Sequence, residues 1–382
     1  MLTMNTDEQI KVDVIGKVDA KKITIKQAMQ ILNKSESTIF RYLKNYRKAG
    51  IIFVKHKNSL KVPVNKTAPD IENKIIHFCS TKYKDFNRSH AREELAANEL
   101  KTIARDTFNR ICNRNELLNK KTKRRTPKPR KRRERMKQTG VMLQLDGSPH
   151  MWFGRKKSCL VAIIDDATSD ILYGEFSPTE TTFACMNVVK WVLKNHGVFQ
   201  ILYTDRAGIF GRDSTNHAEG VKREGFSSLK NCLQKYKINT IYAYSPQAKG
   251  RIERCFNTLQ DRLVAEFKLN KIFTVEQANK YLNEVYLPKH RKNFTVGPAL
   301  GDSAFIPLVD PHIVEEHFYV KLKRQIKNNH TFNFGGKIFD LKLPKESYAG
   351  KELEIRKYPC GKMSYYVENE QVYLCDSIAR PA

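Results

Sequence analysis

The chain has 382 residues, with 69 lysines and arginines against 40 aspartates and glutamates, so its formal net charge is +29 at pH 7. This length predicts two or three domains. Apolar runs such as residues 160–164 are too short to span a membrane, and residues 1–14 lack a signal-peptide core. The eight cysteines include no CxxC pair. We therefore expect reduced thiols, without a disulfide framework or a structural zinc site, and no membrane partner.

The positive charge is concentrated at the front of the chain. Residues 1–140 hold 35 basic and 14 acidic side chains, a net charge of +21, whereas the other 242 residues hold 34 and 26, a net charge of +8. Clustered lysine and arginine bind nucleic acid strongly because they displace counterions from phosphates. Nucleic acid is the predicted partner, and a merely basic soluble protein is the alternative.

Residues 20–50 have the pattern of a helix-turn-helix. An apolar stripe marks the first helix, at Ile25, Ala28, Ile31 and Leu32. Ser35 is placed to cap a second helix that ends at Gly50. Its inward positions are Ile39, Tyr42, Leu43 and Tyr46. The outward positions that we expect to contact DNA are Ser37, Arg41, Lys44 and Lys48. A plain helical hairpin with a solvated charged face is the alternative.

A second helical module is predicted over residues 71–118. Its last helix has Ile103, Phe108, Ile111 and Cys112 inward. Its predicted DNA contacts are Arg105, Asn109 and Arg110. Two tandem modules would read adjacent stretches of the major groove. We therefore assign residues 1–66 and 67–118 to two DNA-binding domains, both entirely helical.

Residues 119–139 form a predicted basic linker. Twelve of the 18 residues from 120 to 137 are basic and two are proline, so this segment cannot bury a core. We expect it to follow DNA phosphates, and a solvated spacer is the alternative reading. The predicted contacts are Lys123, Arg124, Arg125, Arg130, Arg132 and Arg133.

From Val141 the pattern changes to alternating strands and helices. Strands are predicted at residues 141–147, 158–168, 170–177, 199–205 and 238–245, and helices at residues 181–197, 227–236 and 250–267. Gly197 is expected to end the first of these helices. The order βββαβαβα predicts an α/β domain with a mixed sheet and helices on both faces.

Three carboxylates are placed where this order would bring them together. Asp146 ends the first predicted strand, Asp205 ends the fourth, and Glu253 lies in the first turn of the helix after the fifth. Such a group is costly without cations, and oxygen ligands alone favour Mg²⁺ or Mn²⁺. Asp165 and Asp166 also follow a strand and are rival candidates, but the next residues look like a turn, so we interpret them as hairpin residues that support the site indirectly at most.

Three segments resemble the conserved blocks of bacterial insertion-sequence transposases of the DDE, retroviral-integrase-like type. They are LQLDGSPHMWF, ILYTDRAGIF and YSPQAKGRIERCFNTLQDRL. The resemblance implies a ribonuclease H-like catalytic domain over residues 140–300. It maps the catalytic, metal-binding triad onto Asp146, Asp205 and Glu253. It also implies DNA contacts near the cleaved phosphate by Gln247, Lys249 and Arg251.

The implied activity is that of a DDE-type transposase. Such an enzyme binds the terminal inverted repeats of its element, cleaves their 3′ ends and joins them to target DNA. Two Mg²⁺ ions, or Mn²⁺ in their place, would serve each site, and a homodimer or higher oligomer would act on paired double-stranded ends in the bacterial cytoplasm, at the nucleoid. A non-catalytic DNA-binding regulator derived from a transposase is the alternative, and a simple metal-dependent nuclease is a third reading.

Two features depart from the family pattern. Ala207 stands where a histidine is expected, and the interval from Asp205 to Glu253 is long, which predicts an insertion near residues 211–226. Residues 301–382 are rich in alternating strand patterns and predict a small antiparallel β-barrel. The resemblance favours an SH3-like fold for this barrel. Its basic residues Lys321, Lys323, Arg324 and Lys327 would touch DNA or protect an edge strand.

Overall fold

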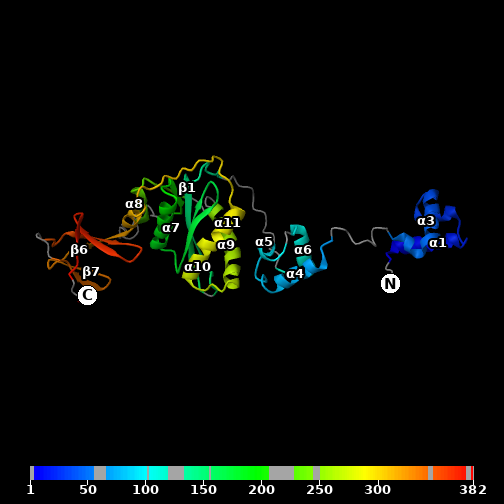
Figure 1. Cartoon of the computed structure of the whole chain (residues 1–382), viewed down its shortest axis with the longest axis horizontal. Coiled ribbons are helices and arrows are strands. Elements are labelled where there is room, and N and C mark those ends of the chain that lie inside the picture. The colour runs from blue at the N-terminus through cyan, green and yellow to red at the C-terminus, as the bar shows by residue number, and fades with distance from the viewer. Residues whose placement is uncertain are drawn as a thin grey trace, which may run out of the picture. The chain divides into compact units, whose positions relative to one another are not determined.

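The structure is a computed structural model that describes residues 4–55, 66–100, 103–118, 133–154, 156–205, 228–243, 250–342, 347–375 and 380–381. By its contacts the chain divides into two compact units, residues 1–76 and 77–382, and the division falls inside helix α4 (Pro69–Ser80) (Figure 1). The finer domain boundaries at residues 66, 118, 139 and 300 stay predictions.

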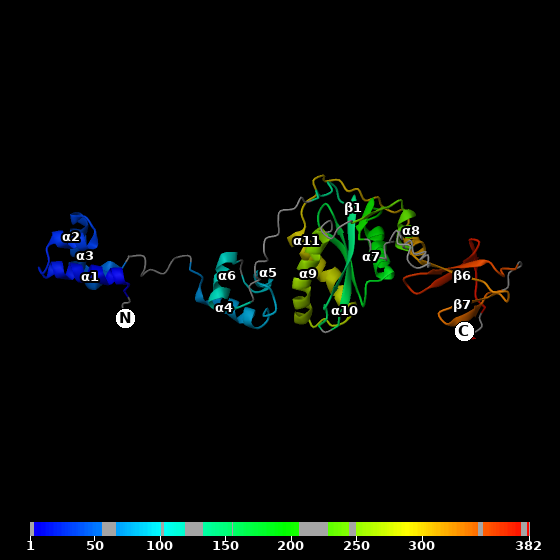
Figure 2. The same cartoon turned by 180° about the vertical axis from the view of Figure 1, so that it is seen from behind.

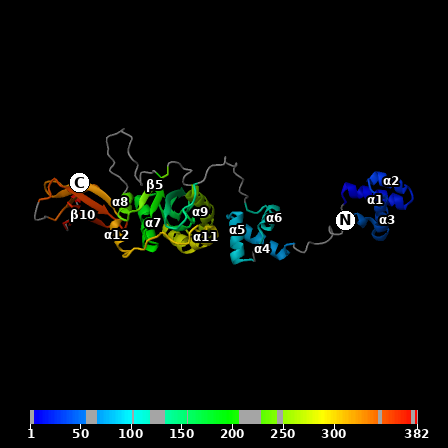
Figure 3. The same cartoon turned by 90° about the horizontal axis from the view of Figure 1, so that it is seen from above.

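The first unit contains a three-helix module with its own apolar core. Helices α1 (Thr6–Asp19), α2 (Ile25–Leu32) and α3 (Glu36–Ala49) are followed by a 3₁₀ turn, η1 (Gly50–Val54) (Figure 3). The core is formed by Val14, Ile15, Val18, Ala28, Ile39 and Leu43. The predicted helix-turn-helix is therefore present, as α2 and α3. Its partner α1 was not predicted, although Asn5 and Glu8 form a capping box at its start.

Two details of this module differ from the prediction. Ile31 is 56% exposed, because the inward stripe of the short helix α2 runs through Ala28 with Ile25, Met29 and Leu32. Ser35 is the N-cap residue of α3, but its hydroxyl bonds the hydroxyls of Ser37 and Thr38 and makes no bond to the helix backbone.

The segment after the first module is also helical, as predicted. It contains α4, α5 (Arg88–Asn98) and α6 (Arg105–Arg114). Phe108, Ile111 and Cys112 of α6 are buried, and Ile103 is half-buried. This pattern agrees with the predicted inward face of the third helix.

The α/β core follows the predicted order of elements. Its strands are β1 (Met142–His150), β2 (Ser158–Asp165), β3 (Ile171–Ser177), β4 (Ile201–Thr204) and β5 (Asn239–Tyr242). Its helices are α7 (Thr182–Asn195), α8 (Ser228–Gln234) and α9 (Gly250–Leu269), followed by α10 (Val275–Tyr281), a π-helical turn η3 (Leu282–Tyr286) and α11 (Leu287–Phe294). The mixed sheet has the order β3-β2-β1-β4-β5.

Two apolar layers sandwich this sheet. Leu143, Leu145 and Val161 face α7 and α8, whereas Leu160 and Ala162 face α9, α10 and α11. Figures 1 and 2 show α7 and α9 on opposite sides of β1. The alternation arises because successive side chains of a strand point to opposite faces. Helices therefore cover both faces, as the sequence predicted.

Gly197 ends helix α7 as predicted, and the reason is visible in the structure. Its φ of +101° is one that glycine adopts readily. A Cβ atom at this position would lie 2.4 Å from the carbonyl oxygen of Ile306. The turn after α7 therefore packs directly against the backbone of the segment that leads to the C-terminal strands.

In the part of the C-terminal region that the structure describes, the strands form two sheets, and the predicted SH3-like barrel is not confirmed. After α12 (Ile313–His317), the strands β6 (Val320–Gln325), β9 (Glu352–Lys357), β10 (Met363–Val367) and β11 (Glu370–Val372) form one sheet. The strands β7 (Thr331–Phe334), β8 (Lys337–Asp340) and β12 (Arg380–Pro381) form another. The two described sheets share one core, which includes Phe332 and Leu353. A turn at residues 326–330 separates β6 from β7, so the ladder is interrupted where a barrel would continue.

All eight cysteines are free in this structure, and the reduced state of the thiols stays a prediction. Cys79 and Cys112 lie close enough for a thiol hydrogen bond between α4 and α6. Within the described ranges, no helix is both long and apolar enough to cross a bilayer.

Candidate active site

Asp146 and Asp205 lie side by side at one edge of the central sheet. The parallel ladder between β1 and β4 ends with Gln144 opposite Tyr203. Asp146 and Asp205 each come two residues later, so they continue the same register on the same face. Adjacent strands are about 4.8 Å apart, so this register places the two aspartates at neighbouring backbone positions. Contrary to the prediction, Asp146 does not end its strand, because β1 continues to His150 while β4 ends at Thr204.

The face on which these aspartates lie is the face that α9 covers. Asp146 pairs across the ladder with Ala162, which belongs to the apolar layer under α9. Its Oδ1 accepts a hydrogen bond from the amide of Gly147 at 3.0 Å, which orients the carboxylate. Helix α9 is tied to the same strand by Gln260, whose Nε2 donates to Ser148 Oγ at 2.9 Å.

Glu253 lies in the first turn of α9 and is exposed, because the buried side of this helix is formed by Ile252, Phe256 and Leu259. The structure does not bring the three carboxylates within contact of one another. Among the described residues, the one group of three or more metal-ligating side chains with donor atoms within 4.8 Å is elsewhere. The fold thus pairs the two aspartates and places Glu253 at the start of the helix that covers them.

Glu180 is a fourth carboxylate at this edge, and the sequence patterns did not point to it. A Cβ atom on Gly147 would lie 2.6 Å from Glu180 Oε2, so the carboxylate rests on the strand backbone next to Asp146, on the α7 side of the sheet and opposite the face of Asp146. Its negative charge is felt by Cys185, whose pKa is raised by burial and then by Glu180, Cys159, Asp146 and Asp205. Burial and Glu180 similarly raise the pKa of Cys159 to about 12. Because β3 runs parallel to β1, the loop after β3 lies at the same end of the sheet as Asp146. Its position was the signal that could have indicated Glu180.

The predicted DNA contacts on the helical modules are available at the surface. Ser37, Arg41, Lys44 and Lys48 of α3 are all exposed, as are Arg105 and Arg110 of α6, while Asn109 is half-buried. These side chains therefore lie opposite the apolar faces of their helices. Lys123, Arg124, Arg125, Arg130, Arg132, Gln247 and Lys249 lie outside the described residues, as do Ala207 and the predicted insertion near residues 211–226.

Arg133 and Arg251, the two other predicted DNA contacts, both bind Asp166 in this structure. Asp166 is fully buried, and Arg251 Nη1 donates to its Oδ1 at 2.7 Å, while Arg133 forms a short ion pair with the same oxygen. Burial alone would raise the pKa of Asp166, but hydrogen bonds from Arg133 and Met136 and the charges of both arginines lower it. Contact of these arginines with DNA stays a prediction.

Asp165 is a hairpin residue, as interpreted from the sequence. Its Oδ1 accepts hydrogen bonds from the amides of Ala167 and Thr168 at 2.9 and 3.1 Å, which closes the turn into β3. Its Oδ2 accepts from the amide of Gly140 at 2.8 Å. Burial raises the pKa of Asp165 despite these bonds. The side chain is thus fully engaged within the fold.

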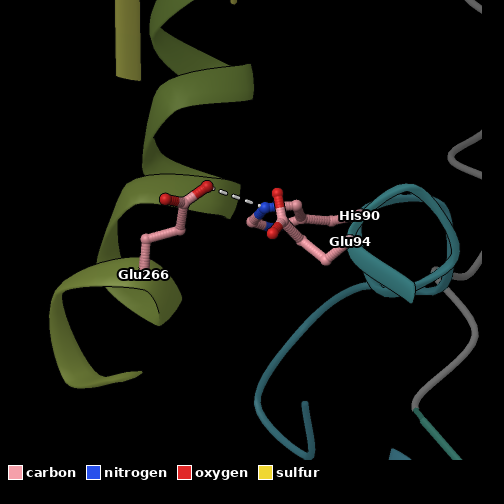
Figure 4. Close-up of side chains that lie close together, drawn as sticks. All are labelled: His90, Glu94 and Glu266. Atoms are coloured by element: carbon pink, nitrogen blue, oxygen red, sulfur yellow. Dashed lines mark hydrogen bonds and ion pairs between the residues drawn. The ribbon is translucent and has the colours of Figure 1, made fainter. Parts of the chain in front are cut away.

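A second polar cluster joins α5 to α9 and is shown in Figure 4. His90, Glu94 and Glu266 have ligand atoms within 4.8 Å of one another. His90 Nε2 and Glu266 Oε1 are 2.9 Å apart, and Tyr281 makes a short hydrogen bond to the other oxygen of Glu266. Lys289 lies 3.4 Å from Glu94. His90 Nδ1 is buried without a hydrogen-bond partner among the described residues, while the two glutamates each have protein partners. We interpret the cluster as a structural contact between the two helices.

The same contact is extended by two more pairs. Both Nη atoms of Arg262, on α9, donate hydrogen bonds to the carboxylate of Glu93 on α5, at 2.6 and 3.2 Å. The side-chain amide of Asn87 donates a hydrogen bond to Asp261 at 2.5 Å. The Arg262 side chain is 10% exposed. Breaking a buried pair on one side is strongly destabilising because the remaining charge is left without compensation. The last helices before the linker are thus held to the helix that carries Glu253.

His290 of α11 makes the stability of this region depend on pH. Its buried ring stacks on Phe294, and burial followed by the charges of Arg262 and Arg291 lowers its pKa to about 4. In the unfolded chain, the His290 ring binds a proton below about pH 6.5, whereas in the folded chain it stays neutral down to about pH 4. The free energy of unfolding therefore falls by roughly 3 kcal/mol as the pH drops from 6.5 to 4. His290→Phe should flatten the unfolding free energy over this window in urea titrations. The exposed His312→Phe is the control, and equal slopes for wild type and His290→Phe would contradict the prediction.

Comparison with known proteins gives similarities along most of the chain. Residues 5–55 match the homeodomain-like domain family. The chain is 28% identical over 338 residues to the "Putative transposase y4bF" of Sinorhizobium fredii, covering 87% of this chain and 72% of that protein. It is 30% identical over 309 residues to the "Transposase for insertion sequence IS1202" of Streptococcus pneumoniae, covering 72% of this chain and 66% of that protein.

Two viral structures are also similar. The HTLV-2 integrase catalytic core domain in complex with magnesium covers 39% of this chain and 89% of its own, at 15% identity and a TM-score of 0.29. The simian T-cell lymphotropic virus intasome in complex with PP2A regulatory subunit B56 gamma covers 81% of this chain and 98% of its own, at 12% identity and a TM-score of 0.35.

Proposed function

Because the chain belongs to the transposases, we propose that it binds the terminal inverted repeats of an insertion sequence, cleaves their 3′ ends and joins them to target DNA. The observation that carries the chemistry is the shared register of Asp146 and Asp205 at one edge of the sheet, under a helix that begins with Glu253 in its first turn. The surface helix α3 and the basic linker supply recognition and affinity.

The carboxylates fit a divalent metal of the Mg²⁺ class. Asp146 and Asp205 occupy corresponding positions on neighbouring strands and offer oxygen donors only, and Glu180 adds negative charge from the other face of the sheet. Such a set is stabilised by a hard cation with oxygen ligands. Two Mg²⁺ ions held by Asp146, Asp205 and Glu253 would supply activation of the attacking oxygen and stabilisation of the leaving 3′-oxygen.

The protein's own groups orient this site. The amide of Gly147 donates to one oxygen of Asp146 and so fixes the direction in which the carboxylate points. Glu253 is exposed on the first turn of α9, so its carboxylate can change rotamer without unpacking the helix. Helix α9 is itself fixed by its apolar side and by Gln260. Positioning of this kind is the main contribution of a protein to phosphoryl transfer.

The direct test uses DNA that carries the inverted repeats found on either side of the reading frame. Purified protein with Mg²⁺ should cut the 3′ ends of this DNA and join them to a plasmid target, and a scrambled repeat should not react. Specific binding without any cut or joined product, at all Mg²⁺ and Mn²⁺ concentrations, would instead establish the alternative, a DNA-binding regulator derived from a transposase.

End binding is expected to weaken steeply with salt. A protein that neutralises six to ten phosphates loses about 10³–10⁵-fold in affinity between 50 and 200 mM salt. Changing Arg124, Arg125, Arg130 and Arg132 together to glutamine should lower the slope of log affinity against log salt by roughly 0.9 for each phosphate that the linker no longer neutralises. Arg41→Ala should relax sequence preference instead. Fluorescence anisotropy over a salt series measures both, and an unchanged slope for the linker variant would show that the linker is only a spacer.

A further inference from the structure

Asp166 lies at the centre of a buried polar network under the candidate active site. This residue follows β2 and is completely buried. Its Oδ1 accepts from Gln144 Nε2 at 2.5 Å and from Arg251 Nη1 at 2.7 Å. Its Oδ2 accepts from the amide of Met136 at 3.0 Å and from Arg133 Nη1 at 3.3 Å. A hairpin residue does not need this number of distant partners.

The network touches each element that carries a candidate catalytic carboxylate. Gln144 comes two residues before Asp146 on β1, and Arg251 comes two residues before Glu253 on α9. The contact with β4 is made by Arg133, whose guanidinium lies 5.3 Å from the ring centroid of Tyr203. Tyr203 comes two residues before Asp205. Residues two apart on a strand share a face at a spacing of about 6.5 Å, so the network lies one step below the two aspartates on the same face.

Two further hydrogen bonds connect members of the network to one another, and one of them involves the end of the basic linker. Arg251 Nη2 donates to the carbonyl oxygen of Arg133 at 2.6 Å, and the amide of Asp166 donates to the carbonyl oxygen of Met142 on β1 at 3.0 Å. The Arg251 side chain is 11% exposed, so this is an interior ion pair. Interior pairs of this kind impose a particular geometry, because a misaligned charge in the interior is costly.

We propose that Asp166 is a positioning residue that, together with Arg133, holds β1, β4 and α9 in the relative placement at which Asp146, Asp205 and Glu253 bind metal. This inference rests on the proposed function, since it concerns the same site. It makes the last part of the basic linker a component of the active-site framework. Asp166 touches neither DNA nor metal; it acts through Gln144, Arg251 and Arg133. Partners that orient metal ligands typically change metal affinity or activity by about 10–100-fold when removed.

The test compares Asp166→Asn with a matched control in the same turn. Asp170 is also a β2–β3 turn residue and accepts from Arg291 Nε at 2.7 Å, and α11, to which Arg291 belongs, carries no candidate ligand. Asp170→Asn therefore removes one ion pair from the same turn without affecting the network. Mn²⁺ binding, followed without DNA by the electron paramagnetic resonance signal of the free ion, is the first readout. The joining rate at saturating DNA and the affinity for DNA ends are the others.

Asp166→Asn is expected to weaken Mn²⁺ binding and slow joining by about tenfold or more, with end affinity unchanged. Arg251→Lys keeps the charge but cannot reach both Asp166 and the Arg133 carbonyl, so it should weaken Mn²⁺ binding in the same direction without leaving Asp166 unpaired. It keeps the proposal testable where Asp166→Asn does not fold. Asp170→Asn should match the wild type in both Mn²⁺ binding and joining.

The outcomes separate the inference from the function on which it rests. Wild-type Mn²⁺ affinity and joining in both Asp166→Asn and Arg251→Lys would overturn the inference alone. Equal losses in Asp166→Asn and Asp170→Asn would also overturn it, because they would reflect general destabilisation. A wild-type protein that neither binds Mn²⁺ nor joins DNA would overturn the proposed function itself.

Discussion

Changing Asp146 or Asp205 to asparagine, or Glu253 to glutamine, is expected to abolish cleavage and joining while leaving the binding of DNA ends unchanged. The amide keeps the size of the side chain but removes the charge that a divalent cation requires. Because each carboxylate would act on the reacting phosphate through bound metal, we expect a loss on the order of 10³-fold or more for each single change. Gel assays of cut and joined products, with anisotropy for binding, measure the two effects separately.

The chain offers a matched control for the third residue. Glu276 is, like Glu253, an exposed glutamate in the first turn of a helix, α10. Glu276→Gln makes the same chemical change at the same kind of position, away from the sheet edge, and should join DNA at the wild-type rate. Near-normal joining by Glu253→Gln would show that Glu253 is not the third ligand.

The order of the central elements could be predicted from the sequence because each element has a clear local period. The apolar runs of β2 and β3 and the amphipathic pattern of α7 are local signals, and Gly197 marks the helix end. The pairing of Asp146 with Asp205 followed from that order, since parallel neighbours bring corresponding strand ends together. The position of Asp146 within β1 did not follow, because β1 continues along its other neighbour, β2, after β4 has ended.

The polar contacts that surround the site could not be predicted in the same way. His90 and Glu266 are 176 positions apart, and Arg251 and Asp166 are 85 apart. Each of these residues lies on a helix surface or in a turn, and the neighbouring sequence does not indicate which distant residue it contacts. For this reason the sequence alone predicts a hairpin residue at Asp166, with at most an indirect role at the site. Its burial depends on Arg133, Gln144 and Arg251 converging in three dimensions.

In the C-terminal region, the strands could be predicted from the sequence but their pairing could not. The strand patterns predicted over residues 301–382 are matched by observed strands, because alternation of apolar and polar residues is a strong local signal. Closure of a barrel depends instead on whether β6 and β7 continue one ladder, and the intervening turn directs β7 into a separate sheet. The strand pattern predicts strands; it does not predict which edges meet.

Removing residues 1–66 is expected to separate recognition from chemistry. The first helical module has a core of its own, formed by residues such as Ile15, Ala28 and Ile39, so its loss should not unfold the rest of the chain. The shortened protein should still bind Mn²⁺ and join DNA weakly. Its affinity for the inverted repeats should fall toward that for scrambled DNA, a loss of about 10³-fold or more. The reason is that α3 carries the exposed side chains proposed to read bases.

The point of truncation matters because of the contact between α5 and α9. A fragment that began near Gly140, as the sequence alone would have favoured, would leave Arg262 without Glu93 and Glu266 without His90. Both are buried charges, and exposing one partner alone costs stability. Unfolding curves should therefore show a folded core for residues 67–382 and a clearly less stable one for residues 140–382. Full discrimination between repeat and scrambled DNA by the chain that lacks residues 1–66 would refute this division of labour, since recognition would then lie in α4–α6 or in the core.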